Sequence, residues 1–433
     1  MTTSSQWLEP AFEAIAIDDD GRACSDIPES ACKDEAGNFF AHIAALSLSK
    51  SADALVDPKL VLSWLITALG APAALVGLLV PIREAGALLP QIFISERLRR
   101  LPQRKWAWAA GALVQGLAAL AIAGSAVLLT GLQAGIAILV ALAVLSLARS
   151  VCSVCYKDVL GKTVDKSRRG RATGLASSLS AIVAIAFAVI LYWSNAERFD
   201  IVVGALFVAG LVWIGGSFVF TTLSEEAGAT EGGASAFQSA MDNLQYLKTE
   251  PQLRAFILTR ALLTATAFAP PFMVALGSEG QASPQNLGLL VFSSALSALL
   301  SSFVWGTLAD SSSRKVLIMA SVIGATALIA TVACAFFGLV QNDYVLPALL
   351  FVLMVSYQGV RLGRSTHLVD MATSETRAAF TALSNSAIGI VLLAGGAFSL
   401  IANIAGLEVT LTILAVMCAI ACWPASKLNE VQG

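Results

Sequence analysis

Long runs of apolar residues with almost no charge recur along this chain between residues 38 and 426. Each run holds about twenty residues, enough for a helix to cross about 30 Å of hydrocarbon. Leu, Ala, Ile and Val fill the runs without the two-residue alternation of an outer-membrane barrel strand. Because a chain in lipid must satisfy its backbone hydrogen bonds internally, we expect an all-α membrane protein.

The rest of the composition agrees with a chain whose main solvent is lipid. Of its 433 residues, 57% are hydrophobic and 13% are charged, far from the averages of soluble domains. The net charge of -2 gives no indication of nucleic-acid binding. Residues 1–37 are polar and acidic, and no basic segment precedes an apolar one, so we expect a cytoplasmic tail rather than a cleaved signal peptide.

The apolar runs predict about twelve transmembrane helices in two six-helix halves. The first six are expected near residues 38–62, 72–95, 104–131, 133–156, 173–193 and 199–222. The second six are expected near residues 253–276, 286–308, 316–338, 344–366, 379–402 and 406–426.

These spans divide the chain into five parts. They are the tail 1–37, a first bundle 38–222, a cytoplasmic linker 223–252, a second bundle 253–426 and a cytoplasmic C-terminus 427–433. The linker is expected to hold an amphipathic surface helix, because its apolar residues recur on one side. Those residues are Phe237, Met241, Leu244 and Leu247.

Basic residues gather in alternate loops, which sets the expected orientation. They follow the second, fourth, eighth and tenth spans: Arg97, Arg99, Arg100, Arg104, Lys105; Lys157, Lys162, Lys166, Arg168, Arg169, Arg171; Arg314, Lys315; and Arg377. The opposite loops hold little that is basic beyond Lys59 and Arg198. We therefore expect both termini in the cytoplasm, with the protein in an inner or plasma membrane.

The two halves repeat at an offset of about 210 residues, as expected of a transporter built from parallel repeats. Arg104-Lys105 corresponds to Arg314-Lys315, and the segment 169–175 entering the fifth span corresponds to 377–383 entering the eleventh. Two matches at one offset support each other.

The loop after the eighth span carries Gly306, then Asp310, then the basic pair Arg314-Lys315. This loop resembles the cytoplasmic loop motif of the major facilitator superfamily. The resemblance implies two six-helix halves, and it implies that Asp310 and Arg314 latch the cytoplasmic ends of helices. The alternative is that these two residues only cap helix ends in solvent.

The first-half copy of this motif departs from the pattern. At the same offset, Glu96 stands in the place of the glycine and Arg100 in the place of the acid. A latch after the second span would therefore have to be built from Glu96 with Arg97.

Four ionisable residues are expected near the middle of the membrane, where charge is costly and usually functional. Counting about 1.5 Å per residue from the predicted span ends places Lys50, Asp53, Arg83 and Glu84 about 17 to 22 Å deep. We hypothesise that Lys50 pairs with Glu84 and Asp53 with Arg83, and that one carboxylate takes a proton when substrate displaces its partner. The alternative is a fixed salt-bridge cluster.

Further basic residues lie in other spans. Arg149 and Arg260 are candidates for the same cavity, and with Lys50 and Arg83 they favour an anionic or zwitterionic substrate. Arg361 and Arg364 lie near the inner end of the tenth span, where snorkelling to the interface is the common explanation.

The chain has seven cysteines and only two histidines. A reducing compartment argues against disulfides. Cys24 with Cys32 in the tail and Cys152 with Cys155 in the fourth span are weak metal candidates, so we expect no metal site and no cofactor.

These features predict a monomeric, proton-coupled secondary active transporter that moves a small solute by alternating access, as a symporter or antiporter. Drug or metabolite efflux is an alternative substrate class. A non-transporting assembly factor or sensor, with the acidic tail as its docking arm, is the rival from another class. No nucleophile, base or metal-ligand spacing indicates an enzyme.

Overall fold

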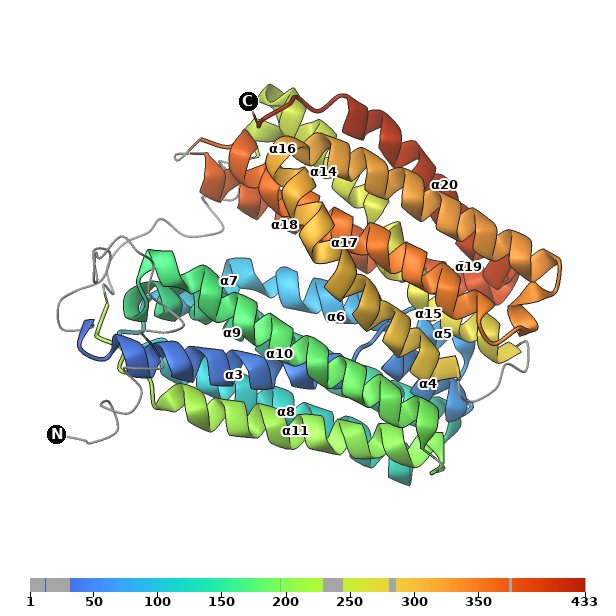
Figure 1. The fold of residues 1–433 in the computed structure, drawn as a ribbon, viewed down its shortest axis with the longest axis horizontal. Coiled ribbons are helices and arrows are strands. Elements are labelled where there is room, and N and C mark those ends of the chain that lie inside the picture. The colour runs from blue at the N-terminus through green and yellow to red at the C-terminus, as the bar shows by residue number, and fades with distance from the viewer. Residues whose placement is uncertain are drawn as a thin grey trace.

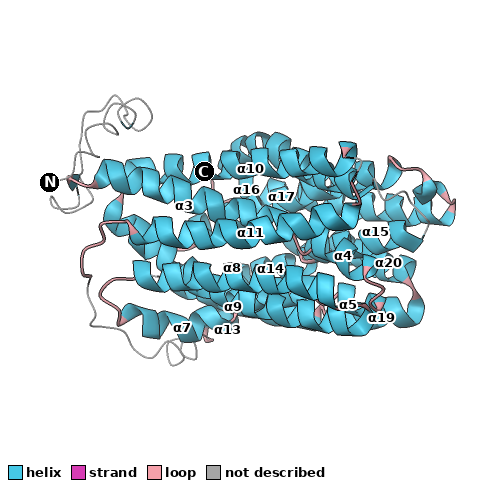
Figure 2. Ribbon diagram, turned by 90° about the horizontal axis from the view of Figure 1, so that it is seen from below, coloured by secondary structure: helices cyan, strands magenta, loops and turns pink. Residues whose placement is uncertain are grey.

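Every regular element that the structure describes is a helix. The computed structural model describes Phe12 and residues 32–194, 196–228, 244–279, 286–373 and 376–432. The long helices run side by side along one axis (Figure 2). Most of the acidic tail, and the predicted linker helix with Phe237 and Met241, lie outside the described residues.

In the described part of the chain, ten helical segments are long and apolar enough to cross a membrane. The eighth predicted span corresponds to a shorter apolar helix, Leu287–Ser301. The first corresponds to a broken helix that carries Lys50 and Asp53 and is therefore not uniformly apolar. The protein is a multi-pass integral membrane protein.

In the first half, the described residues form nine helical segments. They are α3 (Glu35–Leu55), α4 (Val61–Ala68), α5 (Ala73–Val76), α6 (Leu79–Leu88), α7 (Pro90–Arg99), α8 (Lys105–Leu128), α9 (Gly131–Thr163), α10 (Lys166–Trp193) and α11 (Arg198–Thr221). The predicted second span is thus three short helices. Pro90 begins the last of them, where a residue without a backbone N–H is tolerated.

The remaining elements begin inside the predicted linker, with α13 (Tyr246–Thr249), and continue through the second half. After α13 come α14 (Pro251–Leu263), α15 (Ala265–Glu279), α16 (Asn286–Phe336), the short η1 (Leu339–Gln341), α17 (Val345–Met371), α18 (Arg377–Ala394), α19 (Ala397–Ala405) and α20 (Leu407–Ser426). The eighth and ninth predicted spans are joined in α16, whose helical geometry fails at Ser312 (φ -166°, ψ 97°). The Ser312 Oγ accepts the Lys315 N–H at 3.1 Å and so begins the helix anew.

The helices meet at two ends of the bundle. One end, which we call the basic end, is where α3 begins and where α16 breaks. It also holds the connections from α7 to α8, from α9 to α10 and from α17 to α18. We call the opposite end the far end. In Figure 1 the first half lies below the second, and α4, α5, α15 and α19 come together at the far end, on the right.

The apolar core is arranged differently at the two ends. At the far end one cluster includes residues of both halves, such as Leu65 of α4 and Phe272 of α15. At the basic end each half has a separate cluster, around Trp108 in the first and Phe256 in the second. The halves therefore share a core only towards the far end.

Close approach at the far end depends on a glycine. A Cβ added at Gly77 would lie 2.2 Å from the Ser399 Oγ and 2.8 Å from the Phe272 ring, both in the second half. Small residues at such contacts let helix backbones approach closely in a membrane.

Candidate functional site

Asp53 of α3 binds an arginine from each of two other helices. Its Oδ1 accepts from the Arg83 guanidinium of α6, and its Oδ2 accepts from the Arg149 guanidinium of α9. The side chains of Arg83 and Asp53 are only 10% and 19% exposed. The hypothesis that Asp53 pairs with Arg83 agrees with this geometry, and Arg149 joins the same carboxylate.

The hypothesis that Lys50 pairs with Glu84 is wrong. Lys50 donates to the Ser177 hydroxyl of α10, because α3 packs against α10 and α11 rather than against α6. Among the described residues, Glu84 makes no hydrogen bond or ion pair. It is instead in the electrostatic field of four cations, namely Lys59, Arg83, Arg361 and Arg364.

Lys59 was expected in an outer loop, and the structure corrects this. Lys59 is 6% exposed, and its Nζ lies 3.6 Å from the ring centroid of Tyr357 in α17. The reason is a break in the first span. The Asp57 Oδ1 accepts the N–H groups of Lys59 and Leu60 at 2.8 and 2.9 Å and so holds the turn before α4, which continues the span to Ala68.

Two arginines of α17 also face the first half. Tyr357, Arg361 and Arg364 are spaced by four and three residues and share one helix face. Arg361 interacts electrostatically with Lys50, Arg149 and Glu84. Its hydrogen bond goes to Gln358 of its own helix, at 3.3 Å. Snorkelling to the interface stays a prediction for both arginines.

Arg260 of α14 is 6% exposed and is held within the second half. It donates to the Ser384 hydroxyl and, at 3.4 Å, to the Asn385 amide oxygen, both on α18. Its Nε has no hydrogen-bond partner in the part of the chain that the structure describes. Arg260 also interacts electrostatically with Arg364 of α17.

These residues form what we call the central charge cluster. Its acids are Asp53, Asp57 and Glu84, and its cations are Lys50, Lys59, Arg83, Arg149, Arg260, Arg361 and Arg364. The cations outnumber the acids, and Asp53 already uses both oxygens on two of them. Since a charge at this depth costs on the order of 2.5 to 3.5 kcal/mol, such an excess suits a position where water or an anion reaches the cations.

The second-half loop motif is engaged by the C-terminal segment of the chain. Arg314 donates to the Leu428 carbonyl at 3.2 Å and pairs with Glu430 at 3.5 Å. Asp310 is exposed and, with Asp370 and Arg377, lines a surface hollow of about 740 Å³. Gly306 is half-buried and Lys315 is exposed. A latch between the two halves at Asp310 and Arg314 remains a prediction.

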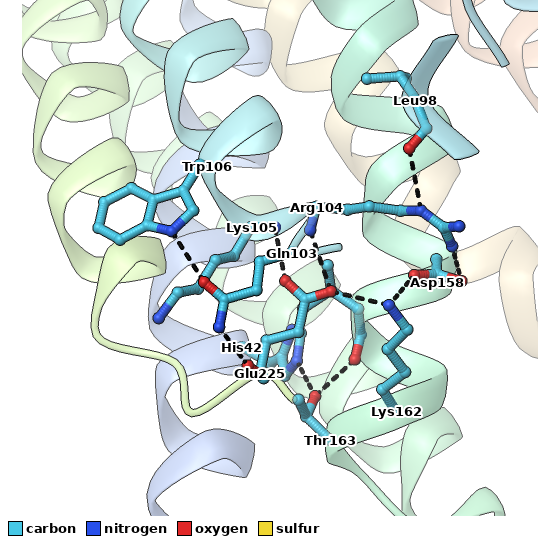
Figure 3. Close-up of polar contacts among 11 residues, drawn as sticks. His42, Leu98, Gln103, Arg104, Lys105, Trp106, Asp158, Lys162, Thr163 and Glu225 are labelled. Carbon is cyan, nitrogen blue, oxygen red and sulfur yellow. Dashed lines mark hydrogen bonds and ion pairs between the residues drawn. The ribbon is translucent and has the colours of Figure 1, made fainter. Parts of the chain in front are cut away.

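The first-half loop is held by a residue that no motif indicated. The carboxylate of Glu225, just after α11, accepts the N–H groups of Arg104 at 3.1 Å and Lys105 at 2.7 Å and pairs with Lys162 at 3.0 Å (Figure 3). Asp158 links Arg104 to Lys162. These five residues, which we call the basic-end clasp, join α8, α9 and the start of the linker.

Of the latch predicted in this first-half loop, Arg97 is exposed. The side chain of Glu96 lies outside the described residues, so the structure does not test this pair.

Replacing Glu225 by Gln is expected to lower the free energy of unfolding by about 1 to 2 kcal/mol, because the amide caps α8 less well and loses the Lys162 ion pair. Thermal unfolding of the purified protein in detergent measures the change. Glu226→Gln is the matched control, since Glu226 is the exposed neighbour. Equal stabilities of the two variants would contradict the capping role.

The cysteines of α9 are buried and free. Cys152 contacts the Gln115 amide at 3.2 Å and the Trp108 carbonyl at 3.4 Å, and Cys155 packs in the same apolar cluster. In the described ranges, no group of three or more His, Cys, Asp or Glu side chains could hold a metal ion.

Cys32 corrects the expectation of reduced thiols, since it is disulfide-bonded. That expectation rested on the compartment alone, whereas a disulfide depends on the distance between two Cα atoms, which sequence spacing does not reveal. Cys24 lies outside the described residues.

This chain is similar to known proteins in its structure but not detectably in its sequence. No protein-family model matches the chain, and no curated protein matches its sequence. A variant of the nucleoside transporter NupG superposes with a TM-score of 0.72 at 12% identity, covering 91% of this chain and 100% of that one. A D-xylose-proton symporter superposes with a TM-score of 0.66 at 11% identity, covering 91% of this chain and 98% of that one. A POT family transporter in complex with a thioalcohol-conjugated peptide superposes with a TM-score of 0.68 at 9% identity, covering 89% of this chain and 94% of that one. At such identities the likeness shows a shared fold.

Proposed function

We propose that this chain, whose fold is that of the major facilitator superfamily, is a secondary active transporter that moves a small anionic solute together with protons. It acts as a monomer, since one chain contains both halves. The basic end faces the cytoplasm, because basic loops are retained on that side of an inner or plasma membrane. Both termini then lie in the cytoplasm.

The excess of cations in the central charge cluster carries the proposal. Among the described residues, Arg361 and Arg364 form no ion pair with a carboxylate, and the hydrogen bond of Lys50 goes to the Ser177 hydroxyl. An anion between the halves would accept charge-assisted hydrogen bonds from these groups. A cationic solute would meet repulsion at the same place.

The arrangement of the core supports alternating access. One core is shared at the far end and the cores are separate at the basic end, which supports a state in which the halves are closed at the far end and divided at the basic end. Transport requires a second state with the opposite arrangement, and the substrate must bind both states. The Gly77 contact with Ser399 and Phe272 is among those that must separate.

Glu84 is the proposed proton site. It lies among the cations that an anion would engage, and it has no hydrogen-bonded partner among the described residues that holds it ionised. Anion binding to Arg361 and Arg364 withdraws their stabilisation of the carboxylate, so anion and proton are taken up together. Proton coupling in this fold has a precedent in the D-xylose-proton symporter.

A ligand-stability screen on purified protein tests the substrate class. We expect anions such as succinate and inorganic phosphate to raise the melting temperature, and cations such as choline to leave it unchanged. The double variant Arg361→Gln, Arg364→Gln should weaken the anion Kd by about tenfold or more, because each charged hydrogen bond contributes about 1.5 to 3 kcal/mol.

The control for this screen is Arg377→Gln, an exposed arginine at the start of α18. It should keep the wild-type response to anions. Stabilisation by cations, or an anion response that survives in the double variant, would contradict the proposed substrate class.

A further inference from the structure

Lys59 and Tyr357 make a polar contact between the two halves. The Lys59 ammonium lies over the Tyr357 ring at 3.6 Å from its centroid, and the lysine is almost fully buried. Within the described part of the chain, no carboxylate forms an ion pair with this ammonium. The face of the Tyr357 ring therefore covers this ammonium, while the Asp57 and Glu84 carboxylates act on it only electrostatically.

The contact lies directly below the closed far end. Lys59 precedes α4, whose eight residues extend about 12 Å further towards that end. There α4 packs against α15, and α5 packs against α19 (Figure 1). Because α4 belongs to the first half and α17 to the second, separating the halves at the far end must lift Lys59 off the Tyr357 ring.

Lys59 is also part of the central charge cluster through Glu84. The two are coupled electrostatically, and Glu84 is coupled in turn to Arg361 and Arg364. Lys59 and these two arginines therefore act on one carboxylate. Without the ring over it, the Lys59 ammonium would be a further cation available beside that carboxylate.

We propose that Lys59 binds the anionic substrate in the state open to the far side, and that Tyr357 covers it when the far end closes. The inference rests on the proposed function. In the state open to the far side, the binding site then has one more available cation than in the state open to the cytoplasm. An anion is therefore held more tightly on entry from the far side than at the point of release.

Trinitrobenzenesulfonate, an anionic amine reagent that does not cross membranes, tests the cover. It is applied to the far side of right-side-out vesicles, and its addition to Lys59 is followed by peptide mass spectrometry. Tyr357→Leu should speed the reaction about tenfold, whereas Tyr357→Phe, which keeps the ring, should stay within twofold of wild type. Equal rates in all three proteins, or a Phe variant that reacts like the Leu variant, overturn the proposal.

Protection by anions tests the binding role. Succinate or inorganic phosphate should slow the reaction of Lys59 in the Tyr357→Leu protein at least threefold, and choline chloride at the same ionic strength should not. Absence of protection by both anions overturns the binding role. The effect of the Tyr357 variants on the reaction of Lys59 is measured without substrate. It can therefore be absent in a protein that still transports anions, so failure of this inference is distinguishable from failure of the proposed function.

Discussion

Replacing Asp53 by Asn is expected to destabilise the protein by about 3 to 5 kcal/mol, the usual effect of removing one partner from a buried ion pair. Asp53 joins α3 to α6 through Arg83 and to α9 through Arg149. Without the carboxylate, two guanidinium groups lose their partner at mid-depth, where charge is costly. Thermal or denaturant unfolding of the purified protein in detergent measures the loss.

Asp200→Asn is the matched control for this prediction. Asp200 lies exposed in the first turn of α11, where the same chemical change should alter stability by about 0.5 kcal/mol or little more. If Asp53→Asn unfolded like this control, Asp53 would not hold the three helices together.

Replacing Glu84 by Gln is expected to abolish accumulation of substrate driven by a pH gradient, with a loss of about tenfold or more. Exchange of labelled for unlabelled substrate should persist, because the cations that bind the anion remain. Accumulation is lost because the amide of the Glu84→Gln variant cannot take up and release a proton when substrate binds. Proteoliposomes that contain the purified variant allow both fluxes to be measured on the same sample.

Glu408→Gln controls for loss of a carboxylate as such. Glu408 lies exposed in the first turn of α20 at the far end. It should keep both accumulation and exchange. If Glu84→Gln accumulated substrate as well as this control, Glu84 would not be the proton site.

The helices could be predicted well from the sequence, because each apolar run must form its own backbone hydrogen bonds in lipid. The exceptions are informative. The first span continues to Ala68 after a turn that the Asp57 side chain holds, and this turn depends on the contacts of a single side chain. The loop after the eighth span is only a break at Ser312.

The site could be predicted in part. Depth along a span identifies mid-membrane charge, and Asp53, Arg83 and Arg149 do come together. Depth does not give the direction in which a side chain points, and Lys50 contacts Ser177 rather than Glu84. The spacing of Tyr357, Arg361 and Arg364 along one helix face was a signal that could have found the arginines facing the first half.

Glu225 had no comparable signal. It acts through backbone N–H groups of α8 that are far away in the sequence, and a single acid after an apolar run has many possible roles. Such a contact follows only from the packing of α8, α9 and α11.

The account is tested most directly by uptake into proteoliposomes that contain the wild-type protein, with the pH gradient as the only driving force. We predict that a small anion accumulates and that protons enter with it, and that both fluxes vanish when the gradient is collapsed with a protonophore. Accumulation of cations in place of anions, or anion entry that ignores the pH gradient, would contradict the central claim.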